Sequence, residues 1–246
     1  MQKLAEGFFA DPTNDLTRSA EDLKAVQDNS MLLLYRILFI SYAESRGLLD
    51  TSNRYYHGMS LQEMKKEIAT KIDAGDFLAP FSYAYWGKLN NLFDLINEGS
   101  ESERWKIERN VFYIPAYNGG LFDPAKNTFL TTKHVSDPYL SKALDLLART
   151  EKAMVDYSSL DIKHLGSIYE GLLEYKLTPD LNLLTDRGER KLTGSFYTPD
   201  PEVKHIVEST IGPVLAQKKD EWFRAGSGKF ADYILSIKVL DLSMGS

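Results

Sequence analysis

Apolar side chains recur every three or four residues through much of the chain up to about residue 180, the spacing of helices that bury one face. Ser19, followed by Glu21 and Asp22, predicts an N-cap with acids in the first helical turn. The apolar stripe of 29–46 is so wide that we expect this helix at the centre of a bundle, closed by Gly47. Further helices are predicted over about 60–72, 77–96, 137–148 and 160–176.

Polar residues set the expectations for the surface and the connections. On the helix that Ser60 caps, Lys65, Lys66 and Glu67 are predicted to form a solvated face. Residues 1–18 show no clear period and are predicted to be a loosely ordered lead-in. Two hairpins are expected. The first has a β-rich segment at Val111–Ile114 and a turn signal at Asn118-Gly-Gly120, and the second runs over 181–194 and turns at Asp186–Glu189.

The last 50 residues change character. Thr198 or Asp200 is expected to cap a helix with Pro201 in its first turn. The apolar face of this helix comprises Val203, Ile206, Val207, Thr210, Ile211 and Val214. A polar stretch, 217–236, is predicted to form a helical insert over a pocket. Val239–Leu242, apolar except for Asp241 and followed by small residues and a glycine, has the pattern of a buried strand that enters a phosphate-binding or cofactor-binding turn.

These patterns predict a mainly α fold, a helical bundle with one or two small β-hairpins, ending in the first strand of a truncated Rossmann-like α/β domain. The expected divisions are a lead-in (1–18), a helical connector domain (19–180) and the start of the α/β domain (181–246). A strand without a sheet around it cannot bury both faces. We therefore expect the front part of a longer protein, with residues 237–246 frayed or packed on a neighbouring copy.

Composition limits the partners. The 246 residues are 43% hydrophobic and 26% charged, as in ordinary globular proteins. A net charge of −6 argues against this chain as the main DNA clamp, because phosphates are contacted by clustered Lys and Arg. The absence of cysteine excludes disulfides and thiolate zinc sites and fits a reducing cytoplasm. The most apolar run, Met31–Ile40, contains Arg36 and is too short to span a membrane, and no signal peptide is present.

Two segments of the C-terminal region together resemble a known family. Gly194-Ser-Phe-Tyr-Thr-Pro199, an amphipathic helix and then Val239-Leu-Asp-Leu-Ser-Met-Gly-Ser246 resemble the start of the methyltransferase domain of class I DNA adenine-N6 methyltransferases. The similarity is greatest to the large single-chain restriction–modification enzymes of type IIG and their phage-defence relatives. The family usually has Pro where this chain has Leu242. Three upstream segments, Leu34–Leu49, Tyr117–Phe122 and Leu165–Tyr175, resemble the helical region before that domain.

The resemblance implies a site for S-adenosylmethionine. The family's motif X places Phe196, Tyr197, Thr198 and Pro199 along the cofactor pocket, and its motif I adds Asp241, Ser243, Met244 and Gly245. Asp241 would accept a hydrogen bond from the cofactor's ammonium group. The implied reaction is methyl transfer to N6 of an adenine flipped out of double-stranded DNA. No catalytic tetrad and no metal site are expected in this chain, so we expect it to be inactive by itself and to bind the cofactor weakly.

Two other motifs imitate functional sites. Gly226–Lys229 resembles a nucleotide-binding loop, but Phe223 stands where that motif needs glycine and Phe230 where it needs Ser or Thr. Ser136–Tyr139 resembles the catalytic tetrad of amino-methyltransferases with one proline too few, and Asp137 is better explained as a helix cap.

The remaining polar candidates favour ordinary structure. Asp156, Asp161 and Lys163 imitate a metal-nuclease pattern, but the acids are too close together, and capping explains them. No metal-binding spacing connects His57, His134, His164 and His205. A basic cluster of Arg187, Arg190 and Lys191 could touch phosphate, although a solvated hairpin explains it better.

Two functions remain open. The first is a fragment of a restriction–modification enzyme whose parent methylates adenine in DNA. The alternative is a non-catalytic helical module that docks a partner protein or DNA in a phage-defence complex. The gene beyond Ser246 distinguishes them, because a glycine codon followed later by Asn-Pro-Pro-Tyr supports the enzyme and a stop codon supports the module.

Overall fold

The structure, a computed structural model, describes residues 1–76, 78–117, 119–150, 153–160, 162–185 and 198–240. It divides the chain into two compact units, Met1–Arg187 and Gly188–Ser246. The described residues are mainly helical with two small antiparallel hairpins, which confirms this part of the predicted fold class. They contain no Rossmann-like sheet. Within the same residues, none of the helices is long and apolar enough to cross a membrane.

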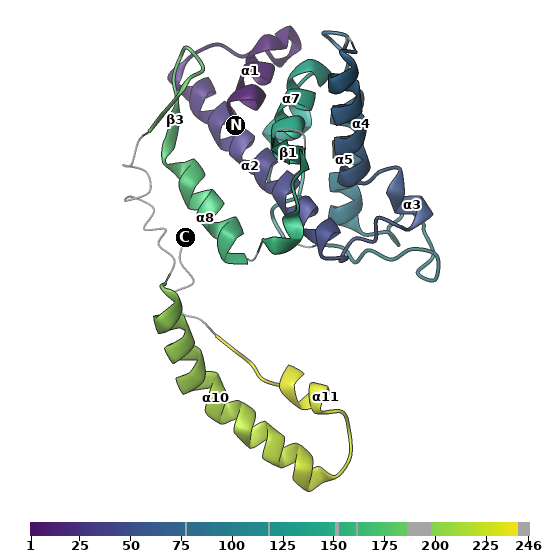
Figure 1. Cartoon of the computed structure of the whole chain (residues 1–246), viewed down its shortest axis with the longest axis vertical. Coiled ribbons are helices and arrows are strands. Elements are labelled where there is room, and N and C mark those ends of the chain that lie inside the picture. Colours follow the sequence, from purple (N-terminus) through teal and green to yellow (C-terminus); the bar gives the residue numbers. More distant parts are fainter. Residues whose placement is uncertain (77, 118, 151–152, 161, 186–197, 241–246) are drawn as a thin grey trace. The chain divides into compact units, whose positions relative to one another are not determined.

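The elements of the N-terminal unit are shown in Figure 1. Its α-helices are α1 (Gln2–Ala10), α2 (Ala20–Ser45), α3 (Arg54–His57), α4 (Leu61–Ala74), α5 (Ala84–Glu98), α6 (Thr128–Thr132), α7 (Asp137–Ala148) and α8 (Ile162–Leu173). Short 3-10 helices cover Pro12–Asn14 (η1) and Tyr157–Ser159 (η2). The hairpins pair β1 (Arg149–Thr150) with β2 (Ala153–Met154) and β3 (Tyr175–Leu177) with β4 (Leu183–Thr185).

Helix α2 forms the centre of this unit, as its wide apolar stripe predicted. Ser19 caps it, since the side chain accepts a hydrogen bond from the Asp22 amide at 3.1 Å. Gly47 follows its end with φ +68°, a conformation that suits glycine. The helix contacts α1, α4, α6, α8 and β3. Its fully buried side chains include Val26, Leu33, Ile37 and Ile40.

The N-terminal segment is part of the core, so the prediction of a loosely ordered lead-in is wrong. Helix α1 buries Leu4 and Phe8 completely. Gly7 packs so closely on α7 that an added Cβ would lie 2.5 Å from Val135 and 2.7 Å from Tyr139. With nine residues, α1 is too short for a helical period to be recognised from sequence. Its apolar side chains are buried because α7 and α2 cover them.

The two observed hairpins lie at positions that the sequence analysis did not predict. Val111–Ile114 lies outside strands, and the backbone of Ile114 instead bonds to Ser100. Helix α8 ends at Leu173, and the chain then forms the β3–β4 hairpin, which the sequence did not predict. The side chain of Gln27 donates to Tyr175 O at 2.9 Å and accepts from Leu177 N at 2.8 Å. Gln27 of α2 thus satisfies backbone groups of β3, in a stretch where the sequence predicts that the helix continues to residue 176. The predicted turn at 186–189 lies outside the described residues.

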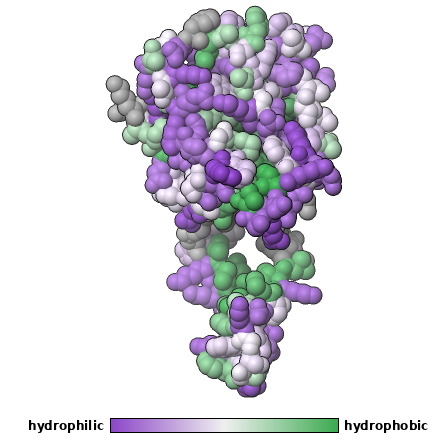
Figure 2. All heavy atoms as spheres, turned by 90° about the vertical axis from the view of Figure 1, so that its right-hand side faces the viewer, coloured by the Kyte–Doolittle hydropathy of each residue, from purple (hydrophilic) through white to green (hydrophobic). Residues whose placement is uncertain are grey.

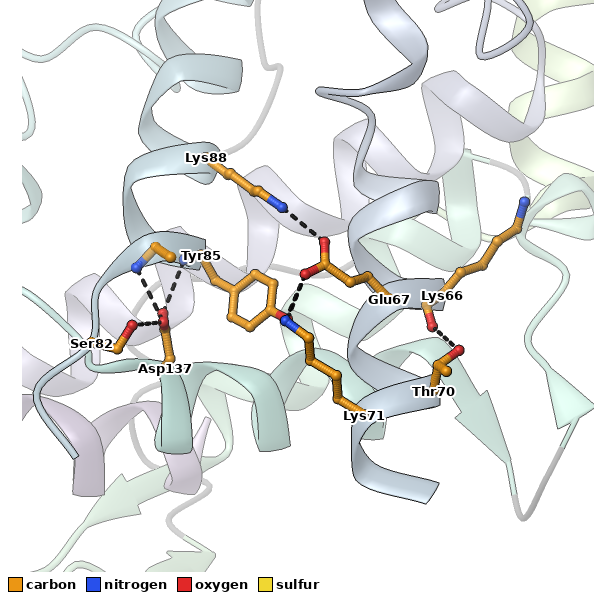
Figure 3. A network of polar contacts seen from close by, with 9 residues as sticks. Lys66, Glu67, Thr70, Lys71, Ser82, Tyr85, Lys88 and Asp137 are labelled. Atoms are coloured by element: carbon orange, nitrogen blue, oxygen red, sulfur yellow. Dashed lines mark hydrogen bonds and ion pairs between the residues drawn. The ribbon is translucent and has the colours of Figure 1, made fainter. Parts of the chain in front are cut away.

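The charged face predicted on α4 is only partly solvated. Lys66 is exposed, as expected, and pairs with Glu63 at 2.6 Å, but Lys65 is buried. Glu67 instead joins α4 to α5, because its carboxylate accepts from Lys71, Tyr85 and Lys88 at 2.8, 3.1 and 2.8 Å (Figure 3). Burial opposes ionisation, yet these hydrogen bonds lower the pKa of Glu67 to about 2.

Asp137 caps a helix, but not its own. Helix α7 begins after Ser136, whereas the buried Asp137 carboxylate accepts from the amides of Ala84 and Tyr85, at 3.1 and 2.9 Å, and from the Ser82 hydroxyl (Figure 3). Asp137 thus provides an acceptor for amides at the start of α5 that have no partner within the helix itself. Helix α5 begins at Ala84, later than the predicted start at residue 77.

The C-terminal unit contains α10 (Asp200–Ala225) and α11 (Phe230–Leu235). The residue at the N-cap position of α10 is Pro199, rather than Thr198 or Asp200. The polar stretch 217–236 is not a separate insert, since α10 continues through its first half and α11 covers most of the rest. Residues 237–240 lie outside strands, so the predicted strand is not formed in its described part.

Candidate functional site

A groove of about 960 Å³ runs along α10 in the C-terminal unit. One wall is the apolar face of α10, and the other is the segment 236–240, which follows α11. Its lining comprises Thr198, Val203, Ile206, Val207, Thr210, Ile211, Val214, Lys218, Ser236, Ile237, Lys238, Val239 and Leu240. A groove of this size lies within the range of small-molecule and cofactor sites in proteins.

The apolar wall follows directly from helical spacing, but its side chains are not buried. Val203, Ile206, Val207 and Val214 of α10 are between 38% and 54% exposed. Across the groove, Val239 and Leu240 are 69% and 81% exposed. Figure 2 shows hydrophobic residues on the surface of this unit. A face of this kind is typical of a surface that receives a ligand or another element of the protein.

The structure brings together the described ends of the two predicted motif segments. Thr198 is the threonine of the Tyr-Thr-Pro segment and lies just before α10. Val239 and Leu240 begin the second segment and precede Asp241. All three line the same groove, although most of the C-terminal unit separates them in sequence. Pro199 is the N-cap of α10. The other predicted cofactor-binding residues, Phe196, Tyr197, Asp241, Ser243, Met244 and Gly245, lie outside the described residues.

The polar groups of the groove are mostly used within the unit. The Thr210 hydroxyl donates to Ile206 O at 2.7 Å, and the Ser236 hydroxyl donates to Tyr233 O at 2.7 Å. Lys218 pairs with Glu221 at 2.8 Å. The described wall is therefore suited to bind an apolar or aromatic group, with the Thr198 hydroxyl at one end.

Two of the segments that imitate other functional sites form ordinary helix ends and caps. Gly226 ends α10 with φ +61°, and Gly228 O accepts the Trp222 indole N–H at 2.9 Å, so 226–229 connects two helices. Asp156 is the N-cap of η2 and accepts from Ser158 N at 2.8 Å. Asp161 and the cluster of Arg187, Arg190 and Lys191 lie outside the described residues. Elsewhere, the described His, Cys, Asp and Glu residues form no group of three or more that could bind a metal ion.

Sequence reasoning missed a second pocket, of about 390 Å³, which lies in the N-terminal unit against Lys65. A signal for the burial of Lys65 was present, because Leu61, Met64, Ile68 and Ala69 form the buried stripe of α4 and Lys65 falls inside that stripe. A lysine at such a position is normally assigned to the surface.

No family model matches the chain, and no curated protein and no solved structure matches it either.

Proposed function

We propose that this chain is part of an S-adenosylmethionine-dependent DNA adenine-N6 methyltransferase of the restriction–modification or phage-defence kind. The observation that supports this most directly is the groove along α10, which Thr198 lines together with Val239 and Leu240. In this proposal the groove is one half of the cofactor pocket. The N-terminal unit is the helical connector that precedes the methyltransferase domain.

The chemistry of the two motif segments suits the cofactor. S-adenosylmethionine supplies the methyl group that is transferred to adenine N6. Phe196, Tyr197, Thr198 and Pro199 would provide an aromatic wall, a hydroxyl and backbone groups for its methionine part. The Asp241 carboxylate would accept a hydrogen bond from its ammonium group, and the backbone of Ser243, Met244 and Gly245 would approach it closely, since glycine has no Cβ in the way.

The exposed face of α10 also fits this proposal. In the complete methyltransferase domain, the valine and isoleucine side chains that are half-exposed here would pack against the central sheet. Burial of this face would contribute to the stability of the domain. In this proposal most phosphate contacts are made by other parts of the protein, because a chain with a net charge of −6 is poorly suited to bind phosphates. Double-stranded DNA is thus a partner of the whole protein rather than of this chain alone.

The test is methyl transfer by the protein expressed from the complete gene. The protein is incubated with DNA and S-adenosylmethionine, and N6-methyladenine is measured by mass spectrometry of the digested DNA. We expect the Asp241→Ala variant to lose about 10- to 100-fold in kcat/KM, because a hydrogen bond between charged groups is lost. Lys204→Ala is the matched control, since Lys204 lies on exposed α10 surface and pairs with Glu208 at 3.8 Å.

A non-catalytic interaction module is the second candidate. The same exposed apolar face of α10 favours it, since such faces also dock other proteins. The methylation assay separates the two functions. Methylation that depends on Asp241 supports the enzyme, and a complete protein that binds its partners but never methylates DNA supports the module.

A further inference from the structure

A pocket in the N-terminal unit contains a buried cation that the proposed function does not use. It lies between the last turns of α2, the first turns of α4 and the segment from β2 to η2, and has a volume of about 390 Å³. Volumes of this size suit small ligands. The pocket belongs to the other compact unit, so a ligand bound there would not depend on the proposed methyltransferase site.

Lys65 lies at the inner end of this pocket and is only 4% exposed. Its ammonium donates to the Ser41 hydroxyl at 2.6 Å and lies 4.4 Å from the centre of the Tyr157 ring. The Ser41 hydroxyl in turn donates to Ile37 O at 2.7 Å, so it is fixed as an acceptor for Lys65. An ammonium has three N–H donors, and within the described part of the chain one of them has a hydrogen-bond acceptor.

Glu44 is the negative charge that acts on Lys65, but its carboxylate forms hydrogen bonds with other groups. One of its oxygens accepts from the Tyr56 hydroxyl and the Leu61 amide, each at 2.7 Å. The other accepts from the Gln62 amide at 2.9 Å. Glu44 therefore caps the start of α4, and it influences Lys65 through the field rather than through a hydrogen bond. Burial lowers the pKa of Lys65 to about 8, although the Glu44 charge opposes the shift.

The other walls limit the ligand that could complete this site. Ala148, Met154 and Val155 provide an apolar wall. Glu44 and Asp156 also line the pocket, and Lys66, the second lysine of the lining, is already paired with Glu63 at 2.6 Å. A ligand with two negative charges would therefore be repelled by the two acids more strongly than one with a single charge. A buried ammonium gains most from a carboxylate acceptor, because charge-assisted hydrogen bonds are the strong ones.

We propose that this pocket binds a small organic monocarboxylate, with its carboxylate on the Lys65 ammonium and its apolar body against Met154 and Val155.

The test is calorimetric titration of the full 246-residue chain with butyrate and benzoate, compared with the uncharged amides of the same acids and with inorganic phosphate. We expect the carboxylates to bind, and the amides and phosphate to bind at least about tenfold more weakly. The Lys65→Met variant is expected to bind butyrate and benzoate about 10- to 100-fold more weakly than the natural chain. Lys142→Met is the control and should bind within about twofold of the natural chain, because Lys142 is exposed on α7 and does not line the pocket.

A second variant keeps the test decisive if Lys65→Met does not fold. Ser45 is exposed at the end of α2 and lines the pocket, so Ser45→Trp should fill the pocket while Lys65 stays in place. We expect it to abolish carboxylate binding. The proposal is overturned if carboxylates bind no better than their amides or phosphate, or if both Lys65→Met and Ser45→Trp bind them like the natural chain.

Discussion

Helices α2 and α10 have the same length, 26 residues each, and opposite surroundings. Thirteen residues of α2 are buried, whereas none of the described side chains of α10 is. Both helices carry valine and isoleucine at helical spacing. The difference shows that an apolar stripe predicts a helix and its inward face, but burial depends on the partners that reach that face.

The same contrast appears in their polar residues. Within α2, Gln27, Ser41 and Arg36 are buried, and each bonds to backbone or to another side chain. On α10 the described bonds are local, as between Lys204 and Glu208 or within the last turns. We infer that α2 is stabilised by the tertiary core, and α10 by local interactions and its contacts with α11.

The largest expected effect tests this contrast directly. Ile37→Ala in α2 removes a fully buried side chain and should lower the free energy of unfolding by about 3 kcal/mol. Ile206→Ala in α10 removes a side chain that is 54% exposed and should cost less than about 1 kcal/mol. Urea denaturation followed by circular dichroism measures both. Equal costs would contradict the contrast, and would indicate that the α10 face is covered in solution.

The next effect concerns the capping of α5 from α7. Asp137→Ala leaves the amides of Ala84 and Tyr85 without their carboxylate acceptor in a buried place, and should lower stability by about 2 kcal/mol. Asp137→Asn keeps an acceptor oxygen and is expected to recover about half of this loss. Thermal unfolding at neutral pH measures both variants. If Asp137→Asn is as unstable as Asp137→Ala, then the charge rather than the acceptor geometry stabilises the helix.

The smallest effect is a pH dependence that arises from Lys65. Its folded-state pKa of about 8 lies below that of an unfolded lysine, so below pH 8 the folded protein carries the full cost of the buried charge. As the pH rises from about 8 toward 10.5, the folded state has lost this proton and the unfolded state still holds it. Stability should therefore rise, by about 1 kcal/mol between pH 7 and 9. Urea titrations of the natural chain and of Lys65→Met give the difference, and a parallel pH dependence in the variant would show that other groups cause it.

Sequence reasoning found the local features of the fold because neighbouring residues determine them. Ser19 accepts from the Asp22 amide and Ser60 from the Glu63 amide, so the caps predicted for α2 and α4 are formed, whereas the cap predicted at Thr198 or Asp200 is not. Helices α2, α4 and α7 lie where the apolar period placed them. The features that it missed depend on distant partners, as Gln27 does for the β3–β4 hairpin and Asp137 for the start of α5.

The candidate site also has one part that the local sequence predicts and another that depends on distant segments. The apolar face of α10 could be read from the sequence, because its residues recur on one side of a helix. Thr198 and Val239 meet in one groove because the chain reverses between α10 and α11, and no local pattern encodes where the returning segment packs. The pocket at Lys65 needed three separate segments to come together, so no motif could have revealed it.

By itself, the sequence determined the mainly helical class of the protein, the approximate positions of most of its helices, the caps at Ser19 and Ser60, and the two motif segments that resemble a methyltransferase. These depend on residues a few positions apart, whose steric and hydrogen-bonding preferences act along the chain. Tertiary structure decided which apolar faces are buried, which carboxylate caps which helix, and that a lysine of α4 lies inside the protein. Such features depend on the dielectric surroundings and on hydrogen-bond partners from distant segments, which exist only once the chain has folded.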